Sequence, residues 1–523
     1  MWHSTSRSDE ELRAARVART ISLAFTSLFL LLICKWKPWE LFSRGGYTTD
    51  FYEEQARAFL HGRVWVSPRV AAIEGFEIDG RTYLYFGPFL AIVRMPFVIF
   101  GHLFDGRLIR ISMVTGFFLL CHAARELVIA AHHWFGRRVS TWRVAVFVAA
   151  VAGSPALFLA GWVTVYHETE LWAATSALWA FVGCVRLVGD AGTRRHGWLT
   201  GAATAATLLT RVSIGIGVAA AVAATLLAAV FRHRTPKRTA VPAFAGIAVG
   251  SCLHFITNFA RFDSLTSIPF DLQSLTLANP ARAAWFAGNG NSFFGLEFAR
   301  TTIVHYLRPD TIRLERLVPF VRFGPPATDR GSYPLEAITA SSSLTNSAPI
   351  LVALAGIGIV LMIQRRTATW IALTTGALLA AIPTLTIAFI ANRYLVDMLP
   401  LIAVPSAVAI TLLRAPSHGV VHTGLRVLAI ALVATAVVVN IALATWYQFQ
   451  RAPGFTALRY RIDEALFDPP SPGLELLRSG PTSVSGDVAL AIDPDDGSCD
   501  AVYIAEGESW VALERANGVV RQI

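Results

Sequence analysis

Long apolar runs, separated by short stretches that carry arginine, make up most of the chain. The first run, 21–36, ends without a small-residue cleavage site, so it predicts a retained membrane anchor and not a signal peptide. The later runs cover 108–131, 144–163, 171–187, two halves of 197–231, 240–259, 348–363, both sides of 391–397, and 427–447. The pattern predicts an all-α polytopic membrane protein with about 11 transmembrane helices in residues 1–447.

The arginines predict the orientation, because basic loops of membrane proteins gather on the cytoplasmic side. Placing every basic cluster inside requires an even number of spans between neighbouring clusters. The run 83–104 contains Pro88, Arg94 and Pro96, so we interpret it as a broken interfacial or re-entrant segment. The run 197–231 then forms two short helices that meet outside near Arg211. This arrangement places the chain in the plasma membrane with a cytoplasmic N-terminus.

Three segments are expected on the outer side. The first outer loop covers 37–106 and the second covers 261–346, whose glycines and aromatic residues are typical of an ordered, partly interfacial cap. The short turn TVYHETE joins the helices 144–163 and 171–187. From 448 the chain becomes polar, and alternating stretches with glycine and aspartate turns predict a small extracytoplasmic β domain, 448–523.

Composition supports the membrane class and excludes several others. The chain is 54% hydrophobic and 15% charged, well below the charge content of water-soluble domains. Its net charge of +10 lies in the loops between apolar runs, so we expect no nucleic-acid partner. Five cysteines do not form a disulfide framework, and no P-loop or GxGxxG follows a predicted strand.

The ionisable residues expected at the outer face are the candidates for chemistry. Asp50 stands just outside the first span, and Glu53 and Glu54 follow one helical turn later. The other candidates are His167, Glu168 and Glu170 in the turn TVYHETE, and Arg211 and Arg393 near later helix ends. Each also has a simpler interpretation: the acids as wet surface groups or helix caps, and Arg393 as an interfacial side chain that reaches toward water.

The acid soon after the first span, the segment GRTYLYFGPFLAIVRMP and the second acid group after the third span resemble the GT-C glycosyltransferases. That family includes protein O-mannosyltransferases, the lipid A aminoarabinose transferase, and mycobacterial arabinosyl- and mannosyltransferases. The same segment also resembles actinobacterial membrane proteins of this type. Many GT-C members have paired acids in the first loop, whereas Asp50 stands alone.

The resemblance implies an inverting transferase that moves a sugar from a polyprenyl-phosphate donor to an envelope acceptor: a glycan, a lipid or a protein. On this hypothesis Asp50 is the general base, with Glu53 and Glu54 as alternatives. Arg393 is the leading phosphate partner, since guanidinium matches phosphate oxygens bidentately, and Arg211 and Arg261 rank below it. His167, Glu168 and Glu170 would orient the acceptor or bind a metal.

No cofactor is expected, because the donor sugar already carries its activating lipid phosphate. HETE lacks the second histidine of HExxH, so it does not indicate a zinc protease. No other pattern indicates a divalent cation, although one is compatible with this chemistry. Two other functions fit the same pattern: a flippase or transporter of a lipid-linked saccharide, and a non-enzymatic partner in envelope assembly.

Overall fold

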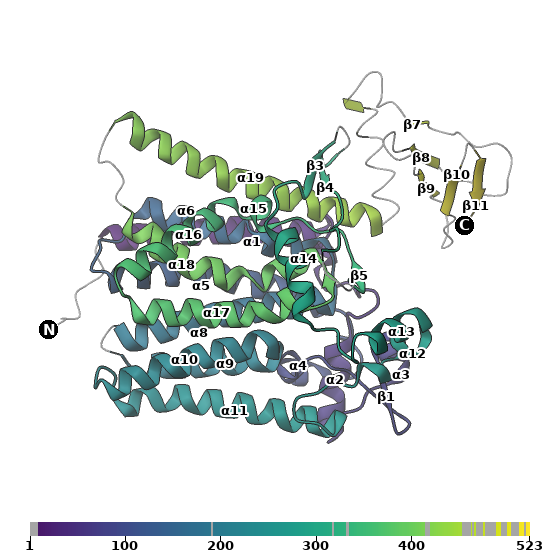
Figure 1. The fold of residues 1–523 in the computed structure, drawn as a ribbon, viewed down its shortest axis with the longest axis horizontal. Coiled ribbons are helices and arrows are strands. Elements are labelled where there is room, and N and C mark those ends of the chain that lie inside the picture. Colours follow the sequence, from purple (N-terminus) through teal and green to yellow (C-terminus); the bar gives the residue numbers. More distant parts are fainter. Residues whose placement is uncertain are drawn as a thin grey trace.

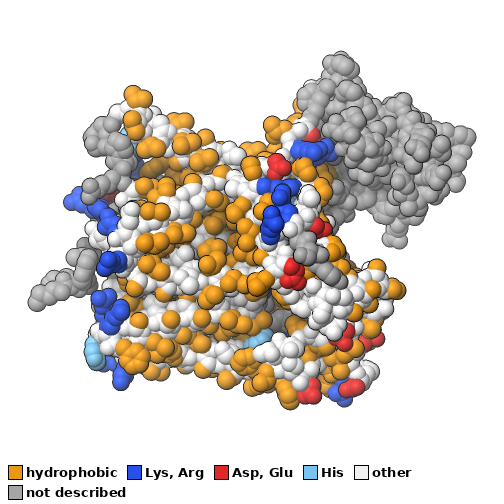
Figure 2. Space-filling model, in the orientation of Figure 1, with side chains coloured by type: hydrophobic (Ala, Val, Ile, Leu, Met, Phe, Trp, Pro, Cys, Tyr) orange, Lys and Arg blue, Asp and Glu red, His pale blue; other side chains and the backbone are white. Residues whose placement is uncertain are grey.

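A computed structural model describes residues 9–189, 192–315, 318–330, 334–413 and 419–451, and short pieces of 462–522. The long helices run side by side along one axis (Figure 1). The two segments predicted to lie outside, 37–106 and 261–346, gather at one end of the bundle, and we call them the first and second outer segments. Lys and Arg side chains line the opposite end, while apolar side chains cover the flank of the helices (Figure 2). The basic clusters and the two large loop segments, which were predicted to lie on opposite sides of the membrane, therefore lie at opposite ends of the bundle.

Eight helical segments of the described chain are long and apolar enough to cross a bilayer. They are α1 (Asp9–Ile33), α5 (Ile109–Trp134), α8 (Val165–Gly189), α10 (Val212–Phe231), α11 (Lys237–Phe262), α17 (Ala368–Thr386), η5 (Asn392–Val396) with α18 (Leu399–Leu412), and α19 (Val420–Arg451). A bent pair and two shorter helices, α9 (Arg194–Thr210) and α16 (Pro349–Gln364), join the same bundle. The predicted all-α polytopic class is confirmed.

The bent pair shows how the sequence breaks a span. α6 (Thr141–Ala152) and α7 (Pro155–Phe158), which continues as η3 (Leu159–Gly161), meet at an angle of 41°. Pro155 cannot donate a backbone hydrogen bond, and Ser154 instead accepts one from the amide of Ala156, so a new helix begins there.

Helix α8 begins earlier than predicted, and the expected outer turn TVYHETE is wrong. Val165 is its first residue, so His167, Glu168 and Glu170 lie within the helix. Thr164 accepts a hydrogen bond from the amide of Tyr166, as an N-cap residue does. His167, Glu168 and Glu170 are all buried, so the bundle encloses these polar side chains.

The first outer segment contains η1 (Pro38–Phe42), α2 (Phe51–Leu60), α3 (Pro68–Ala71), η2 (Ala72–Glu74), β1 (Phe76–Ile78), β2 (Arg81–Tyr83) and α4 (Phe89–Val98). β1 and β2 form an antiparallel hairpin. As predicted for 83–104, α4 is a short apolar helix that contains Pro96 and is too short to span.

The second outer segment contains η4 (Phe270–Leu272), α12 (Ser274–Ala278), α13 (Pro280–Gly288), α14 (Leu296–Leu307), the antiparallel pair β3 (Ile312–Leu314) and β4 (Val321–Phe323), β5 (Ala337–Ile338) and α15 (Leu344–Ser347). β5 pairs in parallel with β6 (Phe389–Ile390). The two outer segments join where the amide of Ser274 donates to Gly75 O at 2.8 Å.

The C-terminal strands form a five-stranded sheet in the order β11-β10-β9-β8-β7, with antiparallel neighbours. They are β7 (Leu474–Glu475), β8 (Val488–Ile492), β9 (Cys499–Tyr503), β10 (Ala512–Ala516) and β11 (Val519–Gln522). The alternating pattern predicted these antiparallel strands. Most of the rest of the predicted domain 448–523 lies outside the described residues; α19 continues to Arg451.

Candidate functional site

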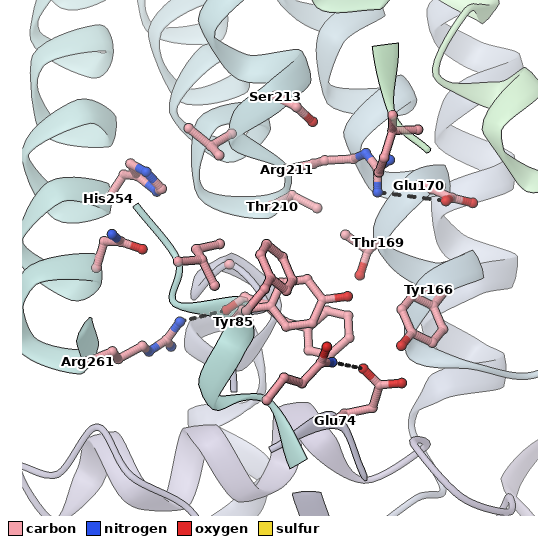
Figure 3. Close-up of a pocket in the computed structure, with 18 of the residues that line it drawn as sticks. Glu74, Tyr85, Tyr166, Thr169, Glu170, Thr210, Arg211, Ser213, His254 and Arg261 are labelled. Carbon is pink, nitrogen blue, oxygen red and sulfur yellow. Dashed lines mark hydrogen bonds and ion pairs between the residues drawn. The ribbon is translucent and has the colours of Figure 1, made fainter. Parts of the chain in front are cut away.

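A cavity of about 370 Å³ lies where the outer segments meet the bundle. Its walls come from the first outer segment, the start of α8, the α9–α10 junction, the end of α11, the second outer segment and residues 387–394. Figure 3 shows Arg261 and His254 on one wall, Arg211 and Glu170 on the opposite one, and Glu74 between them on the side of the outer loops.

Arg261, in the last turn of α11, is a buried cation with unused hydrogen-bond donors. Its Nη1 donates to Phe86 O at 2.9 Å, while Nε and Nη2 have no hydrogen-bond partner among the described residues. The residue is only 5% exposed, and it makes no ion pair with any carboxylate in the described part of the chain. Burying an unpaired charge is costly, so this guanidinium is suited to receive an anion.

A second group of charges lies opposite and is internally neutralised. Arg211 donates to Asp397 at 2.7 Å, and Asp397 also accepts from the hydroxyl of Thr384. Glu170 lies 3.3 Å from Arg393 Nε and 3.7 Å from Arg211 Nη1. Two acids balance two guanidiniums, so this network fixes the wall and carries no net charge.

Arg211 is presented by a break between helices. Its backbone is extended, with φ −148° and ψ 96°, and it ends α9 and begins α10. The predicted meeting of two helices near Arg211 is present at the end of the bundle that carries the outer loops (Figure 1).

Glu74 is the acid of the first outer segment that faces the cavity. Gln273 Nε2 donates to its Oε2 at 3.2 Å, and no guanidinium makes an ion pair with it among the described residues. Burial raises the pKa of the Glu74 carboxyl above its usual value, although a hydrogen bond from Tyr166 opposes the shift. A carboxylate with a raised pKa is suited to accept a proton, and Glu74, unlike Glu170, makes no ion pair with an arginine of the described chain.

Aromatic rings complete the wall near Glu74. Tyr85 stacks on Phe86 with 4.4 Å between centroids and lies 6.2 Å from Phe270. The guanidinium of Arg393 lies 4.9 Å from the ring centroid of Tyr166. Such flat apolar faces suit the C–H face of a sugar ring.

The structure places the predicted first-loop acids away from this cavity. Asp50 occupies the N-cap position of α2, partly exposed, 3.4 Å from Arg44. Glu54 pairs with Arg57 at 2.8 Å and accepts from the amide of Ser67. Glu53 points into the protein, where burial raises its pKa to about 7.

Glu53 and Glu168 share one guanidinium. Arg94, from α4, lies 2.7 Å from Glu168 and 3.4 Å from Glu53, and all three are almost completely buried. The Tyr52 hydroxyl, beside this group, hydrogen-bonds Thr169 of the cavity wall at 2.7 Å. The triad thus ties α2 and α4 to α8 behind the cavity.

His167 is also a packing residue. Its Nδ1 hydrogen-bonds Leu159 O at 2.9 Å, and its ring stacks on Tyr447. Of the predicted site residues, the structure brings together Glu170, Arg211 and Arg393 in the cavity, while His167 and Glu168 are enclosed elsewhere. The described residues contain no group of three His, Cys, Asp or Glu placed to hold a metal ion.

Sequence reasoning missed Glu74, Gln273 and Arg282, and ranked Arg261 too low. Glu74 and Gln273 are 199 residues apart, so no local spacing connects them. The available signal for Arg261 was a single basic residue in the last turn of an otherwise apolar, lipid-facing helix.

Comparisons with known proteins show the fold. No family model and no curated protein sequence matches the chain. The oligosaccharyltransferase of Archaeoglobus fulgidus, solved in complex with Zn and sulfate, superposes with a TM-score of 0.50 at 15% identity. The alignment covers 81% of this chain and 53% of that one. The chain therefore shares its fold with this oligosaccharyltransferase over most of its length.

Two further solved structures are also similar, at lower scores. ArnT from Cupriavidus metallidurans, bound to undecaprenyl phosphate, aligns over 87% of this chain and 81% of its own at 13% identity and a TM-score of 0.39. The A. fulgidus enzyme AglB, in complex with an inhibitory peptide and a dolichol phosphate, gives 14% identity and 0.43, over 82% of this chain and 56% of that one. The chain therefore spans little more than half the length of the oligosaccharyltransferases that it matches.

Proposed function

We propose that this chain is a membrane glycosyltransferase that moves a sugar from a polyprenyl-phosphate donor to an envelope acceptor on the outer face of the plasma membrane. The observation that carries the proposal is Arg261, a buried guanidinium without a carboxylate partner in the described chain, facing a cavity that also holds a carboxylate. A phosphate would supply the missing anion, and Arg261 would bind its oxygens by charge-assisted hydrogen bonds.

The place of Arg261 favours a lipid-linked donor. It lies at the end of α11, whose outer face presents apolar side chains to the bilayer, including Leu253, Ile256 and Phe259. The phosphate site and the lipid phase are therefore neighbours on one helix. A donor could place its tail in the membrane and its phosphate at Arg261 without leaving the bilayer.

The part of the cavity between Arg261 and Glu74 would hold the sugar and the acceptor. Glu74 is the proposed base, because it is the cavity carboxylate that makes no direct ion pair with an arginine of the described chain. It would take the proton of the acceptor hydroxyl while that oxygen bonds to the anomeric carbon and the carbon–oxygen bond to phosphate breaks. The lipid phosphate would leave with the bonding electron pair, held at Arg261. This single displacement inverts the anomeric centre, and the proposal includes no cofactor.

Transfer can be tested with purified full-length protein in nanodiscs and a panel of radiolabelled polyprenyl-phosphate sugars. We expect consumption of one donor, and Glu74→Gln should slow it by about 100- to 10,000-fold, the usual contribution of a general base. Asp50→Asn, the base predicted from the sequence, belongs in the same assay.

The outcomes separate the alternatives. If Asp50→Asn abolishes transfer while Glu74→Gln does not, the base is Asp50 and the cavity assignment is wrong. If no donor is consumed but lipid-linked saccharide crosses the bilayer of vesicles containing the protein, the chain is a flippase and the transferase proposal fails.

A further inference from the structure

A continuous series of polar side chains connects the two outer segments beside the cavity. Glu74 accepts from Gln273 Nε2 at 3.2 Å, Gln273 Oε1 accepts from Arg282 Nη2 at 3.2 Å, and Arg282 Nη1 donates to Glu336 at 2.5 Å. We call these four residues the cross-loop chain. The amide of Glu336 in turn donates to Ala388 O, beside β6.

Arg282 is the residue of the cross-loop chain whose orientation is held by the most hydrogen bonds. Its third donor, Nε, reaches the hydroxyl of Thr276 at 3.1 Å, so each guanidinium nitrogen has a partner. The guanidinium also lies 4.5 Å from the ring centroid of Phe293. A guanidinium held on all sides presents one N–H to Gln273 in a constant direction.

This contact decides which way the Gln273 amide points. The oxygen of the amide faces Arg282, which can only donate, so the NH₂ group must face Glu74. Gln273 is 3% exposed, and its backbone pairs with Phe76, so neither its side chain nor its main chain is free to reorient. The Glu74 carboxylate thus receives a directed hydrogen bond from the second outer segment.

We propose that Gln273 and Arg282 are positioning residues for Glu74: they hold its Oε2 toward the second outer segment, keep the carboxylate ionised, and leave Oε1 to act on the acceptor. This inference rests on the proposed function, in which Glu74 is the base. The first outer segment supplies the carboxylate of Glu74, and the second segment orients it through Gln273 and Arg282.

Other groups around Glu74 also influence the pKa of its carboxyl. Tyr166 of α8 hydrogen-bonds it, and the charges of Arg282 in α13 and Arg393 in η5 favour its ionised form. Tyr47 and Tyr85 lie close enough to interact with its charge. Replacing the Gln273 side chain removes none of these groups, although Arg282 then loses its bond to Gln273.

The test is the pH profile of transfer by Gln273→Met, which keeps the bulk and removes the hydrogen bond. Loss of a bond to the ionised form raises the pKa of the acid, so the acidic limb of kcat/KM should move upward by about one pH unit. Arg282→Lys, which keeps the charge but cannot hold both neighbours, should move it in the same direction. Both variants should approach wild-type rates at alkaline pH.

Ser274→Ala is the matched control. Ser274 joins the same two segments through Gly75 and Glu77 without touching Glu74, so its loss should leave the profile unchanged. A Gln273→Met profile identical to wild type, or an equal shift in Ser274→Ala, would overturn the positioning role.

A second readout needs no turnover. Isotope-edited infrared difference spectra between the wild type and Glu74→Gln report the protonation of Glu74 directly, and Gln273→Met should raise its midpoint. An unchanged midpoint contradicts the inference even if no donor is ever found. If Gln273→Met raises the titration midpoint of Glu74 but the protein transfers no sugar, the positioning contact is supported and only the proposed function is contradicted.

Discussion

At the scale of single residues, Arg261 differs from the other cavity arginines because it makes no ion pair with a carboxylate of the described residues. Arg261→Met should therefore fold with a Tm equal to or above that of the wild type, because it removes an uncompensated buried charge. Arg211→Met, in contrast, leaves Asp397 buried without its cation and should cost about 3 kcal/mol. Thermal unfolding of the two variants in the same detergent checks the contrast, and equal destabilisation would show that Arg261 has a structural partner.

Glu53 gives a prediction about pH. Burial raises its pKa from 4.5 to about 7, so the folded chain holds that proton more tightly than the unfolded chain does. Stability from this group is complete below about pH 4.5 and is lost as the pH rises through 7, by on the order of 3 kcal/mol.

The variant Glu53→Gln never ionises and escapes that loss. It should match the wild type near pH 4 and exceed its Tm near pH 8, to be measured by thermal unfolding at both values. Glu54→Gln, on the same helix but beside Arg57 and partly exposed, serves as the control. A gain of equal size at both pH values would contradict a buried, titrating Glu53.

At the scale of elements, the close contact of α9 with α11 holds Arg261 in place. A Cβ on Gly246 of α11 would lie 2.3 Å from the backbone of Gly201 in α9, which leaves no room for a side chain. Gly246→Val should destabilise the protein by at least about 1–3 kcal/mol and raise the KM for the donor, since α11 must move away.

Gly356→Val is the control for that substitution. A Cβ on Gly356, in α16, would meet no atom of the described residues within 4 Å. The position faces outward, so valine there should change stability by less than about 0.5 kcal/mol. Comparable losses in both variants would mean that β-branching, and not helix contact, causes the effect.

Elements were also the level at which sequence reasoning worked best. Apolar runs and arginine placement located the long helices, although about 11 spans were predicted and eight or nine helices of the described chain are long and apolar enough to cross. Pro96 and Arg94 marked the run 83–104 as a poor spanning segment, and its helix α4 is short. The sequence prediction failed at α8, where the polar run TVYHETE suggested a solvent-exposed turn. In the structure those polar side chains lie inside the bundle, where Arg94 and Arg393 form ion pairs with Glu168 and Glu170 and the carbonyl of Leu159 bonds His167.

At the scale of the whole molecule, the cavity could not be predicted, because its walls come from segments hundreds of residues apart. Glu170, Arg211 and Arg393 were found because charge near a helix end is visible in sequence. Glu74 was not found, because its proposed role as the base depends on its contact with the distant Gln273 and on the lack of an ion pair with an arginine of the described chain.

Orientation is a prediction at this scale. Arginines crowd the end of the bundle opposite the cavity, so that end should face the cytoplasm (Figure 2). In a variant without the native cysteines, Asp271→Cys should react with an impermeant thiol reagent added to intact cells, and Arg137→Cys only after lysis. The reverse result would place the cavity inside and remove the outer-face function.

The central claim is that Arg261 binds the phosphate of a lipid-linked donor, and ligand-induced thermal stabilisation tests it most directly. Undecaprenyl phosphate should stabilise the wild type by roughly 2.7 kcal/mol at a hundredfold excess over Kd, and should leave Arg261→Met unchanged. Equal stabilisation of both proteins, or of neither, would contradict the account.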